Sequence, residues 1–188
     1  MKKLRILATI RKLILEEGFE NASLDRVSVE LGISKKTIYK YYDSKSDILT
    51  ILLKRFIVKH IKYYETKIDY LDPIQRIIQL FYMCNEIYTL IDNKVLRFIA
   101  IYIPEGKDEF STFENNFIVS SFEKAISEGV SLQCFRREID ARILAIMALQ
   151  LAKLRCRIPE LKKSNKDLVQ IIDHFIAGLK NHHEEMKI

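Results

Sequence analysis

Residues that interrupt helices are scarce in this chain of 188 residues, which contains only 5 glycines and 3 prolines. Segments in which apolar and polar residues strictly alternate, the pattern of a half-buried β-strand, are also missing. Hydrophobic residues make up 48% of the chain and charged residues 30%, an ordinary balance for a globular protein. The sequence therefore predicts an all-α fold with long helices and excludes an extensively disordered chain.

Cysteine is also scarce, and its pattern excludes two kinds of stabilising site. The three cysteines, Cys84, Cys134 and Cys156, are odd in number and lie far apart in the chain. They form no CxxC motif and no Cys/His spacing of the kind that binds zinc. We therefore expect free thiols in a reducing compartment, with neither a disulfide framework nor a structural metal.

Signals for export, membrane insertion and catalysis are missing as well. The N-terminus has no long apolar run with a cleavage site, and the apolar stretch "ILAIMALQLA" (143–152) is shorter than the roughly 20 residues of a membrane span. No HExxH, GxSxG or P-loop sequence occurs, and His182 and His183 read as part of a solvated tail. We expect a cytoplasmic protein that is not an enzyme, needs no cofactor or metal, and has no membrane partner.

Positive charge is concentrated at one end of the chain. Residues 1–55 contain 12 Lys and Arg against 7 Asp and Glu, a balance of +5, whereas the remaining 133 residues contain 19 against 18, a balance of +1. A basic end on a nearly neutral body indicates an anionic partner for that end, either nucleic acid or an acidic membrane surface.

Hydrophobic periodicity and capping residues predict about nine helices. Ser23, Ser34, Ser44, Asp72 and Asp140 have the positions of N-caps, and Gly18, Gly32 and Gly129 those of helix ends. Pro104 is expected to end one helix. The predicted helices span residues 3–17, 23–31, 34–42, 44–68, 73–89, 93–103, 108–128, 140–157 and 164–179. We expect two domains, a small one at 1–45 and a larger one at 46–188.

The second and third predicted helices form a helix-turn-helix joined by the turn at Gly32. On a helical wheel, Ile38 faces the core, while Lys36 and Lys40 lie about 160° and 200° away, flanked by Thr37 and Tyr39. Lysines bind phosphates and guanine edges, and Thr and Tyr hydroxyls donate to phosphate oxygens, so this face suits the major groove of DNA. Ser34 and Lys35, at the start of the helix, are further candidates for DNA contacts, since the N-terminus of a helix offers backbone N–H groups to anions.

Two other interpretations of the same features stay open. The lysine- and tyrosine-rich helix can be a solvated face of an ordinary helical bundle. The chain can also be a helical adaptor or a membrane-surface protein that binds acidic lipids through its basic end.

The N-terminal segment resembles the DNA-binding domain of the TetR family of bacterial transcription regulators. The resemblance rests on the "EEGFENAS" junction, the "LGIS" turn, the "TIYKYYDSK" recognition helix and the long helix that follows Lys45, and it covers about residues 4–53. It implies DNA contacts for Thr37 and Tyr39 and phosphate contacts for Lys45 and Ser23. The chain departs from the family pattern at Lys36, where glycine is common, and at Ser28 and Leu31, where alanines are common.

The same resemblance implies a homodimer, a palindromic double-stranded DNA operator and release by an unknown small-molecule effector, with a repressor as the favoured outcome. Aromatic and amide side chains of the larger domain are the candidates for an effector pocket, and their composition favours a neutral, apolar or aromatic ligand. These candidates are Tyr63, Tyr82, Asn85, Tyr88, Phe98, Tyr102 and Phe117. Apolar stripes on the last two helices are the candidates for a four-helix dimer interface, namely Ile143, Met147, Leu151, Leu154, Leu168, Ile172, Phe175 and Leu179.

Overall fold

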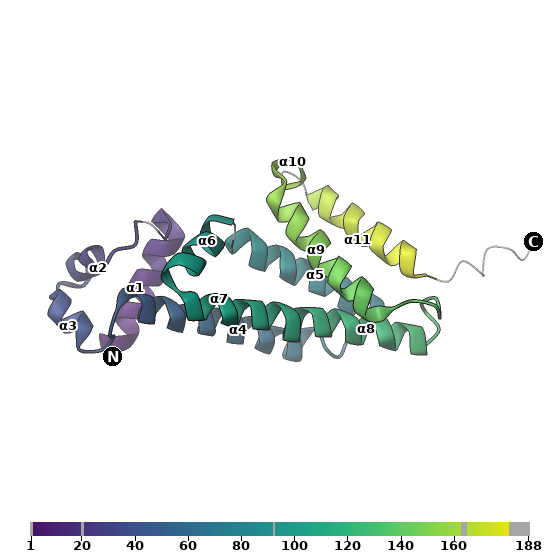
Figure 1. Cartoon of the computed structure of the whole chain (residues 1–188), viewed down its shortest axis with the longest axis horizontal. Coiled ribbons are helices and arrows are strands. Elements are labelled where there is room, and N and C mark those ends of the chain that lie inside the picture. The colour runs from purple at the N-terminus through teal and green to yellow at the C-terminus, as the bar shows by residue number, and fades with distance from the viewer. Residues whose placement is uncertain (1, 20, 92, 163–164, 181–188) are drawn as a thin grey trace, which may run out of the picture. The chain divides into compact units, whose positions relative to one another are not determined.

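The structure is a computed structural model that describes residues 2–19, 21–91, 93–162 and 165–180 (Figure 1). Within these ranges the secondary structure is helical, apart from one isolated antiparallel bridge between Phe135 and Lys180. The expected cap Ser164 and the tail with His182 and His183 lie outside the described residues. The helices are α1 (Lys2–Glu17), α2 (Leu24–Leu31), α3 (Lys35–Tyr39), α4 (Lys45–Lys67), α5 (Pro73–Leu90), α6 (Asn93–Tyr102), α7 (Pro104–Phe113), the π-helix η1 (Glu114–Val119), α8 (Ser120–Ser131), α9 (Ala141–Arg157), α10 (Pro159–Lys162) and α11 (Asn165–Leu179).

The all-α prediction is confirmed, and the helices differ from the expected ones in several places. The helix predicted at 108–128 is divided among α7, η1 and α8, and Gly129, expected to end it, lies inside α8 because its backbone does not adopt the left-handed conformation of a helix end. The helix after the turn ends at Tyr39 rather than Tyr42. Pro104 begins α7 instead of separating two helices by a loop, because proline at the first helical position loses no hydrogen bond that the helix needs. The short helix α10 was not expected from the sequence.

Several predicted caps are confirmed at the level of single hydrogen bonds. The side chain of Asp72 accepts from the Gln75 amide at 3.0 Å, and that of Asp140 accepts from the Ile143 amide at 2.9 Å. At the start of α4, Ser44 Oγ accepts from the Asp47 amide at 3.0 Å. Each of these bonds satisfies an amide that the first turn of a helix leaves without a backbone partner.

The chain divides into two compact units, and the boundaries differ from those expected at residue 45. The first unit contains Met1–Val58 together with Lys94–Phe110, and the second contains Lys59–Asn93 together with Ser111–Ile188. The helix α4 therefore begins in one unit and ends in the other, and the segment that carries α6 and most of α7 joins the helix-turn-helix unit.

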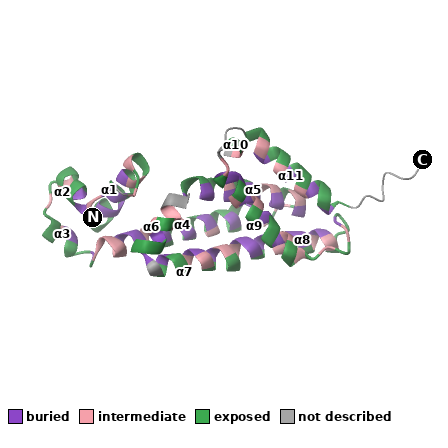
Figure 2. Cartoon of the chain, turned by 45° about the horizontal axis from the view of Figure 1, so that its top comes forward, coloured by how far each residue is buried: buried purple, intermediate pink, exposed green. Residues whose placement is uncertain are grey.

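The core of the first unit is built from the inner faces of α1 to α4 (Figure 2). Helix α1 contributes residues at helical spacing, α2 contributes Leu24 and Val27, and α3 inserts Ile38, which is fully buried. The hydroxyl of the buried Tyr42 donates to the carbonyl of Lys3 at 2.7 Å. This hydrogen bond connects the segment that follows α3 to the start of α1.

The core of the second unit lies among α5, α8 and α9. The ring of Phe81 on α5 is fully buried and makes edge-on contacts with Phe122 of α8 and Phe175 of α11, at centroid distances of 5.2 and 5.3 Å. Edge-on aromatic pairs of this kind add to the free energy of burying the rings.

The described residues contain neither a membrane-spanning helix nor a metal-binding cluster. None of these helices is both long and apolar enough to cross a membrane. Among the described residues, no group of three or more His, Cys, Asp or Glu side chains is arranged to hold a metal ion.

Candidate nucleic-acid interface

The turn between α2 and α3 has the geometry that its sequence predicts. Gly32 adopts the left-handed conformation, with φ 62° and ψ 36°, which a residue with a side chain rarely adopts. The Ile33 amide then donates back to the Ser28 carbonyl at 3.0 Å. Two serines begin the flanking helices, since Ser23 accepts from the Arg26 amide and Ser34 from the Thr37 amide, both at 3.2 Å.

The short helix α3 has a buried side and an exposed cationic side. Ile38 is fully buried, whereas Lys36 and Lys40 are exposed and Tyr39 is 51% exposed. Thr37 lies between the two sides, and its hydroxyl is 3.0 Å from that of Ser34. The residues that point outward are therefore two ammonium groups and a phenol, the groups that bind phosphates and base edges.

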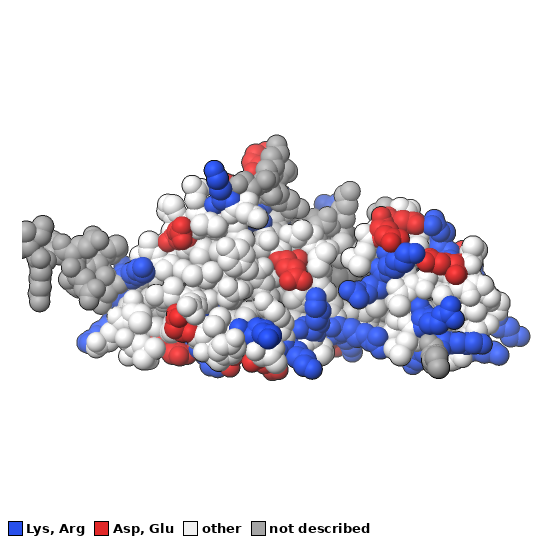
Figure 3. Space-filling model, turned by 180° about the vertical axis from the view of Figure 1, so that it is seen from behind, with Lys and Arg blue, Asp and Glu red and all other residues white. Residues whose placement is uncertain are grey.

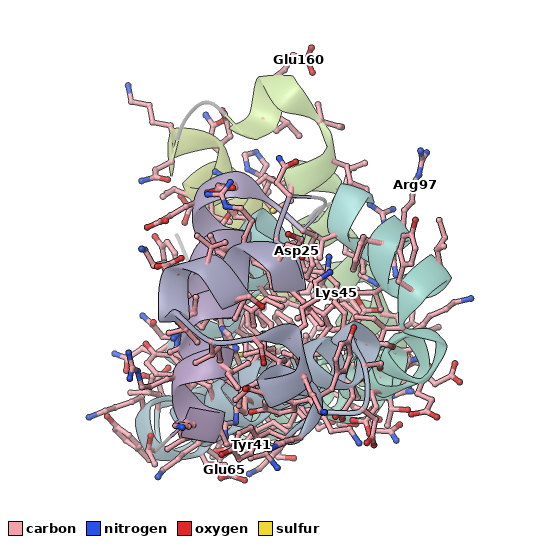
Figure 4. All side chains as sticks on the ribbon, turned by 90° about the vertical axis from the view of Figure 1, so that its left-hand side faces the viewer. Asp25, Tyr41, Lys45, Glu65, Arg97 and Glu160 are labelled. Atoms are coloured by element: carbon pink, nitrogen blue, oxygen red, sulfur yellow. The ribbon has the colours of Figure 1, made fainter. Side chains whose placement is uncertain are left out.

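Lys35 is already engaged by a neighbouring carboxylate. Its ammonium lies 2.7 Å from a carboxylate oxygen of Asp25 on α2, and this hydrogen bond raises the pKa of Lys35. Both side chains remain largely in solvent, so the pair is easily exchanged for a phosphate contact. Figure 4 looks onto this end of the chain, with Asp25, Tyr41 and Lys45 labelled.

Lys45, at the start of α4, is only half exposed. Its ammonium lies 3.4 Å from the carbonyl oxygen of Phe19 and 5.6 Å from the centre of the Phe98 ring. Burial lowers the pKa of Lys45 because it takes water away from the charged form. Lys45 thus differs from Lys36 and Lys40, although the sequence suggested the same role for all three.

Positive charge gathers on the surface of the helix-turn-helix unit, as Figure 3 shows in blue. The balance of +5 in residues 1–55 is therefore carried partly by groups that are accessible to a partner, including Lys36 and Lys40. Phosphate groups bound there would release counterions, the main source of salt-dependent affinity for DNA.

The family model of the bacterial regulatory proteins of the tetR family matches residues 6–50, which run from α1 into the first turns of α4. This match makes the helix-turn-helix segment similar to the DNA-binding domain of the TetR family.

Curated relatives match a part of the chain. An HTH-type transcriptional regulator of Staphylococcus aureus strain USA300 is 38% identical over 69 residues, which are 35% of this chain and 36% of the relative. The chain thus spans about a third of the length of the curated relatives that it matches.

Solved structures extend the likeness in fold to nearly the whole chain. A transcriptional regulator from Saccharomonospora viridis in complex with choline has a TM-score of 0.81 and 21% identity, covering 96% of this chain and 98% of that one. A TetR transcription regulator from Haloarcula marismortui has a TM-score of 0.78 and 16% identity, covering 95% and 98%. At these identities the likeness establishes the fold only.

The candidates for an effector pocket are divided between the two units. Phe98 and Tyr102 belong to the unit of the helix-turn-helix, and the other five belong to the second unit. Tyr88 is buried, and Asn85, Phe98 and Phe117 are half-buried, whereas Tyr63, Tyr82 and Tyr102 are 46%, 43% and 58% exposed. The pocket remains a prediction, and Asn85, Tyr88 and Phe117 are its best-placed members in the second unit.

A cluster of charged and polar side chains that the sequence did not indicate lies between α5, α9 and the start of η1. Lys153 and Glu114 form an ion pair of 2.7 Å in which each side chain is only 13% exposed. The Tyr88 hydroxyl donates to the same carboxylate oxygen at 2.7 Å, and the ring of Tyr88 lies 5.5 Å from the Lys153 ammonium. The buried Arg155 donates to the side-chain oxygen of Asn85.

This cluster could not be predicted from the local sequence, because the neighbours of Glu114 and Lys153 along the chain do not distinguish them from ordinary exposed charged residues of a helix. The expectation of a neutral effector assumed that few charges lie inside the larger domain, and the structure places Glu114, Lys153 and Arg155 there. A π-helix also begins at Glu114, and such segments often occur at functional sites.

The candidates for a dimer interface differ between α9 and α11. On α9, Ile143, Met147 and Leu154 are 57%, 49% and 49% exposed, and Leu151 is half-buried. On α11, Leu168, Ile172 and Leu179 are buried within the single chain, and Phe175 is half-buried against Phe81. The interface stays a prediction, and the apolar surface available for it lies mainly on α9.

Proposed function

We propose that this chain is a transcriptional regulator of the TetR family that reads double-stranded DNA through α3. The observation that carries the proposal is that Lys36 on α3 and Lys40 at its C-cap are exposed, whereas Ile38 between them is fully buried. A buried anchor fixes the helix on its domain, and the opposite side is then free to enter a major groove. In this arrangement Tyr39 and Thr37 flank the lysines and contact phosphates or bases.

The test is the affinity for duplex DNA as a function of salt. Each of Lys36→Ala and Lys40→Ala is expected to lower the slope of log affinity against log salt by about 0.9, the value for one lost phosphate contact. Lys67→Ala is the matched control, because Lys67 is an exposed lysine outside the helix-turn-helix unit. Equal slopes for all variants would refute the role of α3, and equally tight binding to acidic vesicles would favour the membrane-surface alternative.

The regulator is proposed to act as a two-fold homodimer on a palindromic operator, since each subunit supplies one recognition helix. The support within this chain is the stripe of exposed apolar residues on α9, namely Ile143, Ile146, Met147 and Leu154. Their spacing of three, four and seven residues places them on one helix face. Monomeric protein at micromolar concentration in light scattering would contradict this part of the proposal.

The effector is proposed to bind in the second unit, at the cluster of Tyr88, Glu114, Lys153 and Asn85. Buried ion pairs contribute little net stability, so a charged cluster in a core is a candidate for specific recognition. The fold is shared with a regulator solved in complex with choline, which supports a small-molecule effector for this chain.

In the proposed mechanism the effector favours one of two conformations, and operator affinity falls by the difference in its binding free energy, typically about 1–3 kcal/mol. We propose repression as the outcome, because the resemblance to the TetR family favours a repressor. Compounds found to weaken operator binding are expected to lose their effect on Tyr88→Phe or Asn85→Ala, with DNA binding unchanged without ligand. An unchanged response of both variants would place the effector elsewhere.

A further inference from the structure

Lys45 is held by the protein rather than presented to solvent. Its ammonium contacts the carbonyl oxygen of Phe19 at 3.4 Å and lies 5.6 Å from the centre of the Phe98 ring, a cation–π distance. Lys36 and Lys40, by contrast, are exposed. All three lysines are expected to contact DNA, but Lys45 is bound to other groups of the protein before DNA binds, whereas Lys36 and Lys40 are exposed to solvent.

The residues that hold Lys45 form one aromatic group. The ring of Phe98 packs against Phe19 at a centroid distance of 5.3 Å and against Tyr102 at 4.6 Å. Phe19 follows α1, whereas Phe98 and Tyr102 lie on α6, and all three belong to the same compact unit. The group thus links α6 to the start of α4.

Polar contacts also join α6 and α7 to the first half of α4. The hydroxyl of Ser46 donates to the carbonyl of Tyr102 at 2.8 Å, and Lys54 pairs with Glu109 at 2.9 Å. The position of the Phe98 ring over Lys45 is therefore set by a supported segment, not by an isolated side chain.

We propose that Phe98 is a positioning residue that holds the Lys45 ammonium against the protein, so that Lys45 reaches a DNA phosphate only after leaving the Phe98 ring. The inference rests on the proposed DNA-binding function and adds a residue outside the helix-turn-helix that sets its affinity. Binding of a phosphate must replace the contacts with Phe98 and Phe19, and this replacement weakens the complex. A displacement of α6 would change how readily Lys45 becomes available.

The experiment is a double-mutant cycle on binding to a nonspecific duplex at low salt, with correct folding checked by circular dichroism. Phe98→Leu removes the π face and is expected to tighten binding about 2- to 30-fold, the range for loss of a cation–π contact. Phe98→Tyr keeps an aromatic face and is the matched control, expected to bind as the unmodified chain does. In a Lys45→Ala background, Phe98→Leu is expected to change nothing.

Weaker or unchanged binding by Phe98→Leu would overturn the inference, and so would equal tightening in the Lys45→Ala background. If the unmodified chain binds no duplex at all, the proposed function itself fails instead.

A second measurement needs no change at Phe98. The methylene signals of Lys45, assigned by comparison with Lys45→Arg, should be shifted upfield by the ring in the free protein and lose that shift when duplex is added. An unshifted signal in the free protein, or a shift that persists on DNA, would also overturn the inference.

Discussion

The buried ion pair between Lys153 and Glu114 allows a quantitative test of the second unit. Lys153→Met keeps most of the length of the side chain and removes only the charged end. The change leaves the Glu114 carboxylate in a site where it is 13% exposed, with the Tyr88 hydroxyl still donating to it at 2.7 Å. An unpaired charge in such a site is strongly destabilising, because little water is available to replace the lost partner.

The expected loss follows from the exposure of the pair. Breaking a buried pair by removing one partner costs about 3–5 kcal/mol, and the residual exposure of 13% places this pair near the lower end, at about 3 kcal/mol. For a chain of this size each kcal/mol lowers the melting temperature by about 2–4 °C, so the expected decrease is about 6–12 °C.

The assay is thermal unfolding followed by far-ultraviolet circular dichroism, which suits a helical chain without tryptophan. The matched control is Lys124→Met, which removes one partner of a pair of nearly equal length, Lys124–Asp69 at 2.8 Å. There the side chains are 58% and 36% exposed, so the expected cost is only about 0–1 kcal/mol.

A third variant separates the charge from the packing. Adding Glu114→Gln to Lys153→Met removes the unpaired charge but keeps an oxygen that can accept from Tyr88, so the double variant should be more stable than Lys153→Met alone. Equal destabilisation by Lys153→Met and Lys124→Met, or no recovery in the double variant, would refute the argument that burial makes this pair costly to break.

Three further predictions concern other parts of the chain. Gly32→Ala should lower the free energy of unfolding by about 1 kcal/mol through its left-handed backbone alone, since nothing lies within 4 Å of an added Cβ. Gly129→Ala should lower it more, because the added Cβ would lie 2.1 Å from the Phe135 ring. Denaturant unfolding that ranks the two variants in the opposite order would contradict this prediction. Met147→Glu on the exposed face of α9 should yield a monomer in light scattering with unchanged helix content, and an unchanged mass would remove α9 from the interface. Burial raises the pKa of Tyr64 from its ordinary value near 10 to about 12. The stabilisation from keeping its phenol neutral is therefore complete below pH 10 and is lost as pH rises through 12. A titration followed by tyrosinate absorbance should show a group that ionises near pH 12 in the unmodified chain and is missing in Tyr64→Phe, and identical titration curves for the two proteins would refute the prediction.

Much of the helix-turn-helix could be predicted from the sequence, because its signals are local. The caps Ser23 and Ser34 act within three residues of their own positions, and Gly32 is required by the backbone of a single turn. The exposure of Lys36 and Lys40 follows from helical periodicity once Ile38 is placed inside. These features depend on neighbours along the chain and need no knowledge of distant residues.

The state of Lys45 and the buried cluster required the tertiary structure. Lys45 contacts Phe98, which lies 53 residues further along the sequence (98 − 45), and Glu114 contacts Lys153, which lies 39 residues further along (153 − 114). In each case helical periodicity gives the residue's place on its own helix but does not state which helix will face it.

The sequence by itself determined the helices, their caps and the cationic side of α3, because hydrogen bonds and periodicity within a segment fix them. Only the tertiary structure decided which charges are buried and which apolar faces stay exposed, such as Ile143 and Met147 on α9 against Leu168 and Ile172 on α11. An apolar stripe in the sequence indicates that one face of a helix is stabilised by burial. Whether it packs on its own chain or remains exposed for a second one depends on the packing of segments that are distant in the sequence.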